Sequence, residues 1–191
     1  MMVVPTADRV EPVPDRIVFG MVLFLASEVM FFGALFGAYF FLRVQTPVWP
    51  PRDITLDAVE PALATVLLVA SSGTMVLAER AAARGDPRRT TALIGVTAVL
   101  GLLFVASQIR GWLVDDFGIS TNAYGTMFYA MTGFHALHVT AGLVLMVSTL
   151  PVALSAIRSG GSLGQLRATA YYWHFVDVVW VALFATLFVL R

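Results

Sequence analysis

The chain has 191 residues, of which 59% are hydrophobic and 13% charged, against about half and about a quarter in a soluble globular domain. Its formal net charge is zero, so it has no basic field that would attract nucleic acid. It has no cysteine, which excludes disulfides, thiolate metal sites and cysteine nucleophiles. These features indicate an integral membrane protein without a nucleic-acid partner.

Five apolar runs follow a polar N-terminal segment, residues 1–16. Each run is long enough for a helix that crosses a bilayer, which takes about 20 residues, and each far exceeds the length of a strand. The predicted spans are 17–42, 61–83, 90–113, 124–157 and 167–190. The fourth is longer than the lipid core requires, so we expect it to tilt or to continue past Pro151 outside the lipid. The predicted fold is all-α, an integral membrane bundle of five transmembrane helices.

The arginines predict how this bundle is oriented. Eight of them fall on the side of the N-terminus, in the N-terminal segment and the second and fourth loops, and four fall on the other side. By the positive-inside rule the N-terminus is cytoplasmic and the C-terminus outside. We interpret Trp49 and Trp112 on the outer side, and Tyr171, Tyr172 and Trp173 on the inner side, as interfacial aromatic belts.

Five ionisable side chains lie well inside the spans, where lipid offers no hydrogen-bond partner. They are Glu28, His135, His138, His174 and Asp177. The helix rise places all of them except His174 near one depth, about 10–16 Å from the cytoplasmic edge and on three helices. Spacing of i and i+3 puts the first two histidines on one helix face, and likewise His174 and Asp177.

Each of these side chains has a structural and a chemical interpretation. Glu28 is interpreted as an anchor between helices rather than a proton carrier, because most intramembrane polar groups hold helices together. His135 and His138 are interpreted as packing residues, since a metal or haem site needs further suitable ligands. For His174 and Asp177 a helix or subunit contact is preferred over a proton relay. We therefore assign no catalytic, cofactor-binding or metal-ligating residue, and whether Asp177 faces its own bundle or a neighbour stays open.

Small residues spaced by four along a helix let neighbouring backbones approach closely. Gly33 with Gly37, and Gly133 with Ala141, follow this spacing or twice it. We therefore predict close contacts between helices at these positions.

Motifs of soluble enzymes are absent from the sequence. It has no phosphate-binding glycine loop and no nucleophile elbow, and Ser71-Ser72-Gly73 lies in an apolar span without a base nearby in the sequence. From the residues alone, the protein is a small transporter, a membrane enzyme or a scaffold subunit of a complex.

Three blocks resemble subunit III of the haem–copper oxidases, the cytochrome c oxidase polypeptide III family. Residues 20–32, GMVLFLASEVMFF, resemble its Ser-Glu-x-x-Phe-Phe helix. Residues 123–128, AYGTMF, with 132–139, TGFHALHV, resemble its Tyr-Gly-Ser-x-Phe and Thr-Gly-Phe-His-x-x-His-Val segment. Residues 172–180, YWHFVDVVW, are similar to its terminal signature. The resemblance covers nearly all of residues 17–191 and matches the bacterial five-helix form.

Two stretches on the outer side depart from the family pattern. Residues 108–112, QIRGW, stand where the family commonly has Gln-x-x-Glu-Tyr, so that Gly111 replaces an acid and Arg110 adds a base. Residues 120–122, STN, stand where Ser-Asp is common. These changes bear on the branch of the family and on the partner contacted there.

The resemblance implies a non-catalytic structural and regulatory subunit of an aerobic terminal oxidase in the bacterial plasma membrane. It implies no cofactor in this chain other than structural phospholipids, with haem and copper held by partner subunits. The implied partners are subunit I as the main contact, subunit II, a small subunit IV and membrane lipids. The recurrent polar positions of the family coincide with Glu28, His135, His138, His174 and Asp177, with an implied role in packing near the lipid and subunit I contacts. Cytochrome c oxidation coupled to O2 reduction and proton pumping belongs to the complex.

Two alternatives remain at this point. The same fold serves a quinol oxidase or a relative associated with nitric oxide reduction, which neighbouring genes would distinguish through the copper-binding subunit II. An independent proton-coupled transporter that uses Glu28 and Asp177 is disfavoured, because neither inverted repeats nor broken helices are visible in the sequence.

Overall fold

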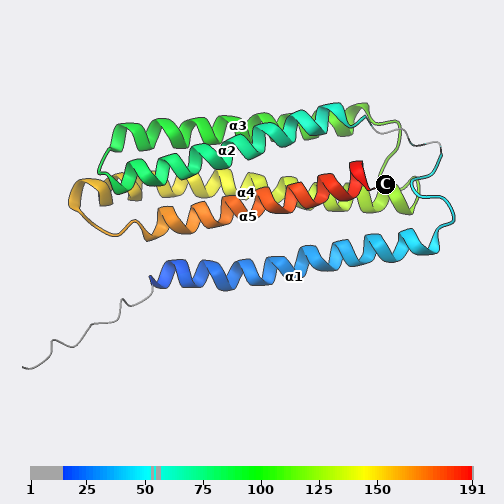
Figure 1. The fold of residues 1–191 in the computed structure, drawn as a ribbon, viewed down its shortest axis with the longest axis horizontal. Coiled ribbons are helices and arrows are strands. Elements are labelled where there is room, and N and C mark those ends of the chain that lie inside the picture. Colours follow the sequence, from blue (N-terminus) through cyan, green and yellow to red (C-terminus); the bar gives the residue numbers. More distant parts are fainter. Residues whose placement is uncertain (1–14, 53, 55–56, 191) are drawn as a thin grey trace, which may run out of the picture.

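The computed structural model describes residues 15–52, 54 and 57–190, which form five long helices running back and forth along one axis (Figure 1). These are α1 (Arg16–Gln45), α2 (Val59–Ala83), α3 (Pro87–Val114), α4 (Ala123–Ser159) and α5 (Gly164–Phe184), and a π-helical segment, Ala185–Val189, continues α5. No strand occurs among the described residues. All five helices are long and apolar enough to cross a membrane, so the predicted all-α fold is confirmed.

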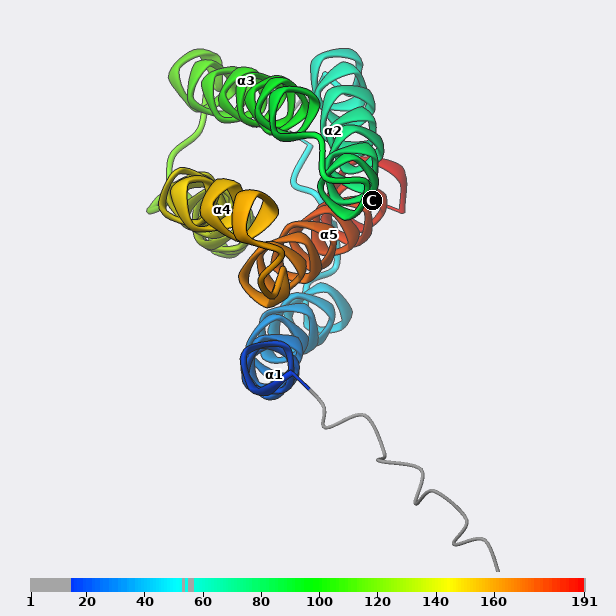
Figure 2. The same ribbon diagram turned by 90° about the vertical axis from the view of Figure 1, so that its left-hand side faces the viewer.

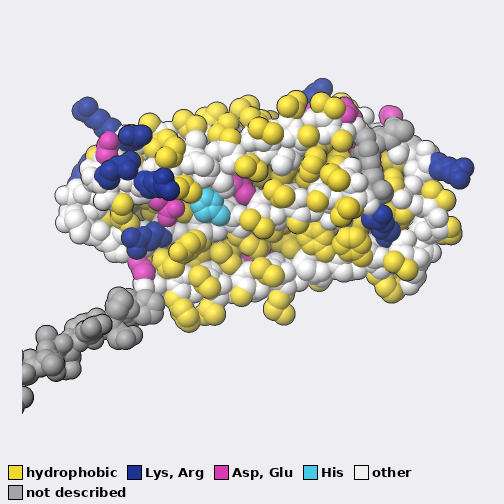
Figure 3. All heavy atoms as spheres, viewed as in Figure 1, with side chains coloured by type: hydrophobic (Ala, Val, Ile, Leu, Met, Phe, Trp, Pro, Cys, Tyr) yellow, Lys and Arg dark blue, Asp and Glu magenta, His cyan; other side chains and the backbone are white. Residues whose placement is uncertain are grey.

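The loops gather at two ends of the bundle because successive helices alternate in direction. The N-side carries the start of α1 and the loops α2–α3 and α4–α5; the C-side carries the other two loops and the end of α5 (Figure 1). Basic side chains crowd the N-side (Figure 3), and the described arginines there are Arg16, Arg80, Arg84, Arg88, Arg89, Arg158 and Arg167. That the N-side faces the cytoplasm stays a prediction, and residues 1–14 lie outside the described part of the chain.

Polar side chains cap the starts of three helices, α1, α3 and α4. The carboxylates of Asp15 and Asp86 each accept a hydrogen bond of 3.0 Å from an amide in the first turn of α1 and α3, and Asn122 accepts one of 2.8 Å at the start of α4. Each contact pairs an amide that the first turn leaves without a partner. All five helices begin one to three residues before the predicted spans.

Helix α4 runs through Pro151 to Ser159 without a break. Its 37 residues correspond to about 55 Å, well beyond the ~30 Å hydrocarbon core. The end of α4 beyond the proline therefore reaches the headgroup region, unless the helix is strongly tilted. It ends at Gly160, whose φ of 70° is a left-handed conformation that glycine adopts without strain.

Helix α5 is the centre of the bundle. Seen along the bundle, it lies between α1 on one side and the group of α2, α3 and α4 on the other (Figure 2). Its indoles Trp173 and Trp180 are almost fully buried, and their N–H groups donate hydrogen bonds of 2.9 Å to Ser71 and Thr65 of α2. Buried indole N–H groups need such partners, so these bonds fasten α5 to α2.

Two glycines allow Trp173 to enter the core. A Cβ added at Gly101 of α3 would lie 2.6 Å from Cη2 of Trp173, and one at Gly142 of α4 would lie 2.8 Å from Cε3. Real Cβ atoms essentially never come so close, so the indole occupies space that only glycine leaves open. This close approach joins α3, α4 and α5.

The predicted close contacts at the other small residues are wrong within this chain. A Cβ at Gly33, Gly37 or Gly133 would have nothing within 4 Å, and Ala141 is exposed. Spacing by four shows that small residues share a helix face, but it does not show which face points inward. Here the added Cβ of each glycine would point into open space.

The predicted inner aromatic belt is also wrong for two of its members. Tyr172 and Trp173 are 3% and 0% exposed inside the bundle, whereas Tyr171 is 49% exposed. Consecutive residues on a helix point about 100° apart, so on α5, which is packed on two sides, three aromatic residues in a row do not all face outward.

Candidate functional site

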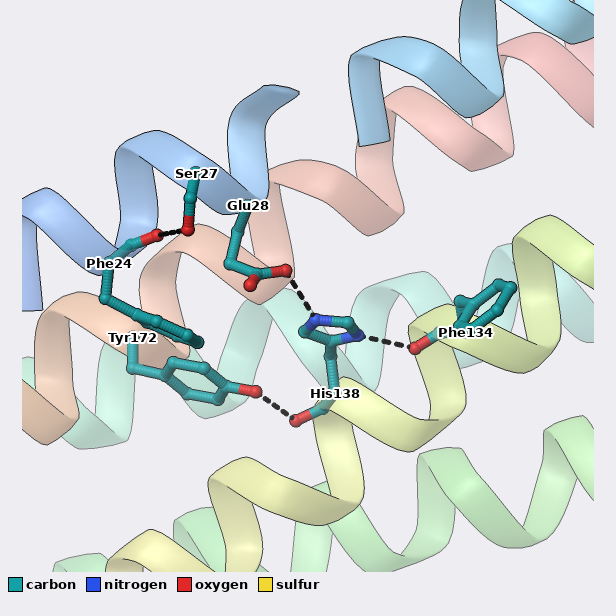
Figure 4. Close-up of polar contacts among 6 residues, drawn as sticks. All are labelled: Phe24, Ser27, Glu28, Phe134, His138 and Tyr172. Atoms are coloured by element: carbon teal, nitrogen blue, oxygen red, sulfur yellow. Dashed lines mark hydrogen bonds and ion pairs between the residues drawn. The ribbon is translucent and has the colours of Figure 1, made fainter. Parts of the chain in front are cut away.

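Glu28 of α1 and His138 of α4 form one intramembrane polar contact (Figure 4). Oε2 of Glu28 lies 2.9 Å from Nε2 of His138, and Nδ1 of the histidine donates to the carbonyl oxygen of Phe134 at 2.7 Å. Because Nδ1 carries its own proton, a single further proton lies between Nε2 and the carboxyl group. The pair is therefore neutral overall whichever of the two groups holds that proton.

Aromatic side chains enclose this contact. The hydroxyl of Tyr172 donates to the carbonyl oxygen of His138 at 3.0 Å, and the Phe24 ring stacks on Tyr172 with centroids 6.3 Å apart (Figure 4). The Phe32 ring packs against the His138 ring at a steep angle, with ring centroids 5.0 Å apart. The side chains of Glu28 and His138 are 17% and 15% exposed. The contact thus links α1, α4 and α5 in a largely water-free environment.

A second polar contact joins α2 to α5 through Ser72. Its Oγ lies 2.8 Å from Nδ1 of His174 and donates a hydrogen bond to Oδ2 of Asp177. The serine has one proton and gives it to the carboxylate, so Nδ1 of the histidine is the donor to Oγ. Asp177 is 5% exposed, and its Oδ1 has no partner among the described residues.

The order of these three groups differs from that of a hydrolase triad. In a triad the histidine lies between serine and carboxylate and takes the serine proton. Here the serine lies between His174 and Asp177, so its proton points at the acid and no imidazole is poised to remove it. The geometry is that of a polar anchor between two helices.

His135 lies apart from both contacts and is fully buried. Its ring centroid is 5.6 Å from that of Phe104 and 5.0 Å from that of Trp180, and neither ring nitrogen has a hydrogen-bond partner in the described part of the chain. No group of three or more histidine, cysteine or acidic residues that could hold a metal occurs among the described residues. His135 packs as an aromatic ring between α3 and α5.

The five residues singled out in the sequence thus occupy three places rather than one polar layer. Asp177 does not meet Glu28 or His138 but turns to α2. Similar depth brings side chains together only when their helix faces share an interface. Sequence spacing missed Ser72 because its partners lie 102 and 105 residues further along the chain.

A lateral groove of about 540 Å³ opens beside Ser72 on the outer face of α2 and α5. It is lined by Val69, Ser72, His174, Asp177, Val178, Val181, Ala182 and Ala185. Figure 3 shows a histidine and acidic side chains within an otherwise hydrophobic side of the bundle. The groove is therefore apolar with one polar spot.

On the C-side, Arg110 and Gly111, which depart from the family pattern, lie beside a cluster of acidic residues. Arg110 pairs with Glu60 of α2 at 2.6 Å, and a small pocket beside them is lined by Glu60, Gly111, Asp57 and Asp115 among others. Burial raises the pKa of Asp115 above its ordinary value, and the neighbouring charges of Asp116 and Glu60 raise it further. A glutamate in place of Gly111 would add another acid here.

Residues 6–190 match the family described as Cytochrome c oxidase subunit III. The chain belongs to this family. The resemblance of the three sequence blocks is thereby confirmed. A member of the cytochrome c oxidase subunit III family is a multi-pass membrane protein and a subunit of a haem–copper oxidase, which supports the main interpretation over the quinol-oxidase and transporter alternatives.

Individual relatives are similar in sequence to this chain over most of their length. "Cytochrome c oxidase subunit 3" of Synechocystis sp. is 37% identical over 183 residues, covering 93% of this chain and 77% of that protein. The protein of the same name from Thermostichus vulcanus is 34% identical over 188 residues, 96% of this chain and 92% of its own. "Probable cytochrome c oxidase subunit 3" of Mycobacterium tuberculosis is 38% identical over 188 residues, which cover 93% of this chain and 90% of that protein.

Proposed function

We propose that the chain is the non-catalytic subunit III of a cytochrome c oxidase in a bacterial plasma membrane. In this proposal the partner subunits hold haem and copper, and this chain stabilises subunit I, retains phospholipids and supports proton uptake. Subunit I is the main contact, with subunit II and a small subunit IV in the same complex. The observation that carries the proposal is the family match over residues 6–190.

The polar contacts favour a structural role. Four of the five intramembrane ionisable groups are used in short contacts between helices, Glu28 with His138 and both His174 and Asp177 with Ser72, rather than in a continuous series across the bundle. Most intramembrane polar groups of this kind hold helices together.

We further propose that subunit I covers the groove between α2 and α5. Ser72, His174 and Asp177 form the polar spot in the lining of this groove, whose other lining residues are apolar. Lipid tails cannot donate a hydrogen bond, whereas a polar side chain on a helix of another subunit can. A subunit contact here would offer this polar spot partners that lipid lacks and would cover apolar surface.

The proposal is tested by purifying the complex in mild detergent through a tag on this chain. Haem a and copper should co-purify at a constant ratio to the tagged chain. A stable haem-free chain that moves protons in liposomes would instead indicate the transporter.

The contact face is tested by Val178→Trp, which fills the α2–α5 groove from a position that is 68% exposed. The matched control is Val66→Trp on α2, which is 65% exposed and lies outside the lining of the α2–α5 groove. We expect Val178→Trp to lower the haem recovered per tagged chain and Val66→Trp to leave it unchanged. Equal recovery from both variants would exclude this face.

A further inference from the structure

We propose that one anionic phospholipid binds along the outer face of α3 and α4 on the N-side, with its phosphate between Arg88 and Arg158. This inference assumes that the chain lies in a bilayer, as the proposed function requires. Two hollows on the same pair of helices carry it, one basic and one apolar.

The basic hollow lies at the N-side end of the helix pair. Its volume is about 480 Å³, and its lining residues are Pro87, Arg88, Thr91, Ala92, Leu154 and Arg158. Neither arginine forms an ion pair with any described residue. The two guanidinium groups offer several N–H donors to the oxygens of a phosphate, the anion that arginine recognises best.

The apolar hollow follows directly towards the middle of the bundle. Its volume is about 450 Å³, and it is lined by Ala98, Leu102, Thr140, Leu143, Val144, Val147 and Ser148. The two hydroxyls donate to carbonyl oxygens of their own helix, Thr140 to Ala136 and Ser148 to Val144. Because these donors are already used, the hollow suits a hydrocarbon chain rather than a polar occupant.

The two hollows form one track of the length of a single leaflet. Helices α3 and α4 pack against each other and run in opposite directions, and residues 88, 91, 95, 98 and 102 fall on one face of α3. Between the hollows lies Gly95, where an added Cβ would have nothing within 4 Å, so the surface stays open. From Arg88 to Leu102 the helix rises about 21 Å. One leaflet has a similar thickness, about 15 Å for half the hydrocarbon core and about 5–7 Å for its headgroup region.

The combination selects a lipid over the other occupants. A free phosphate ion would use the arginines but not the apolar track. A helix of another protein would need an acidic side chain at the arginines as well as an apolar face along the track, whereas a phospholipid carries both parts in one molecule. Basic pockets between transmembrane helices are typical sites for anionic headgroups.

The test uses the purified oxidase complex in nanodiscs of phosphatidylcholine that contain a minor fraction of phosphatidylglycerol. Native mass spectrometry counts the phosphatidylglycerol that stays bound. We expect Arg88→Gln with Arg158→Gln to weaken retention by at least about 100-fold, because each lost hydrogen bond to the charged phosphate weakens binding by about tenfold or more. The matched control, Arg84→Gln with Arg89→Gln, removes the same charge from the same side and should leave retention unchanged.

A second variant addresses the apolar track with both arginines in place. Val147→Trp fills it from a position that is 72% exposed, with Val66→Trp as the control. Loss of the lipid in Val147→Trp alone supports the proposal. Three results would overturn it. The lipid could stay bound in both the arginine and the tryptophan variants, it could be lost equally from both arginine pairs, or inorganic phosphate could displace it. Haem and copper per tagged chain are measured separately, so a failure of assembly is distinguished from a failure of lipid binding.

Discussion

At the scale of single residues, the hydroxyl of Ser72 carries the contact between α2 and α5. It accepts from His174 and donates to Asp177, and lipid offers neither group another partner. We expect Ser72→Ala to lower the free energy of unfolding by about 0.6 kcal/mol and by up to about 2 kcal/mol, as for other intramembrane hydrogen bonds. Thermal unfolding of the complex in detergent measures this loss.

The control is Ser27→Ala, because that hydroxyl donates only to the carbonyl oxygen of Phe24 on its own helix, at 2.6 Å. It should change stability little. Equal losses from the two variants would contradict the role of Ser72 as an anchor.

Asp115 on the C-side gives the protein a pH dependence. Burial and the charges of Asp116 and Glu60 raise its pKa, so the folded chain holds this proton more tightly than the unfolded chain. Just above the ordinary aspartate pKa of about 4, the folded state therefore binds more protons, and its stability falls as the pH rises through that window. Asp115→Asn should flatten the dependence of the melting temperature on pH there. An unchanged slope would show that this carboxyl does not contribute.

At the scale of helices, Gly142 of α4 decides how closely α5 can pack. A Cβ there would meet the Trp173 ring at 2.8 Å. Gly142→Ala should therefore destabilise the bundle by about 1–3 kcal/mol, the usual cost of overpacking. Calorimetry of the purified complex tests this expectation.

Gly133 lies on the same helix, but an added Cβ would have nothing within 4 Å. Gly133→Ala should be neutral or stabilise α4 by up to about 1 kcal/mol, because alanine loses less backbone entropy in a helix. A loss of stability in Gly133→Ala equal to that in Gly142→Ala would refute this account of the packing.

The helices themselves were predictable from the sequence because apolar length alone determines what can cross a lipid core. The faces of the helices were not. Nearly every side of α1 is apolar, yet Phe32 and Tyr39 are its buried residues. In lipid an apolar side chain gains little by turning inward, so hydropathy does not separate the packed face from the exposed one. For this reason the depth of Asp177 could be estimated from the sequence, but its partner on α2 could not.

At the scale of the whole molecule, the bundle offers anchors rather than a reaction centre. The polar groups lie in separate contacts between helices, and large hydrophobic side chains cover much of the outer surface (Figure 3). Helix α1 packs mainly on α5 and leaves most of its own surface open. Such a surface suits a subunit that is surrounded by lipid and by other chains of an oxidase.

The most direct test is to remove this chain from the purified oxidase and measure haem, copper and oxygen consumption in what remains. We expect the remaining complex to keep its haem and copper and to begin reducing oxygen at the original rate per haem. It should then lose activity sooner during turnover, because its stabilising subunit is gone. Loss of haem or copper with the chain, or no oxygen reduction from the start, would contradict a non-catalytic role.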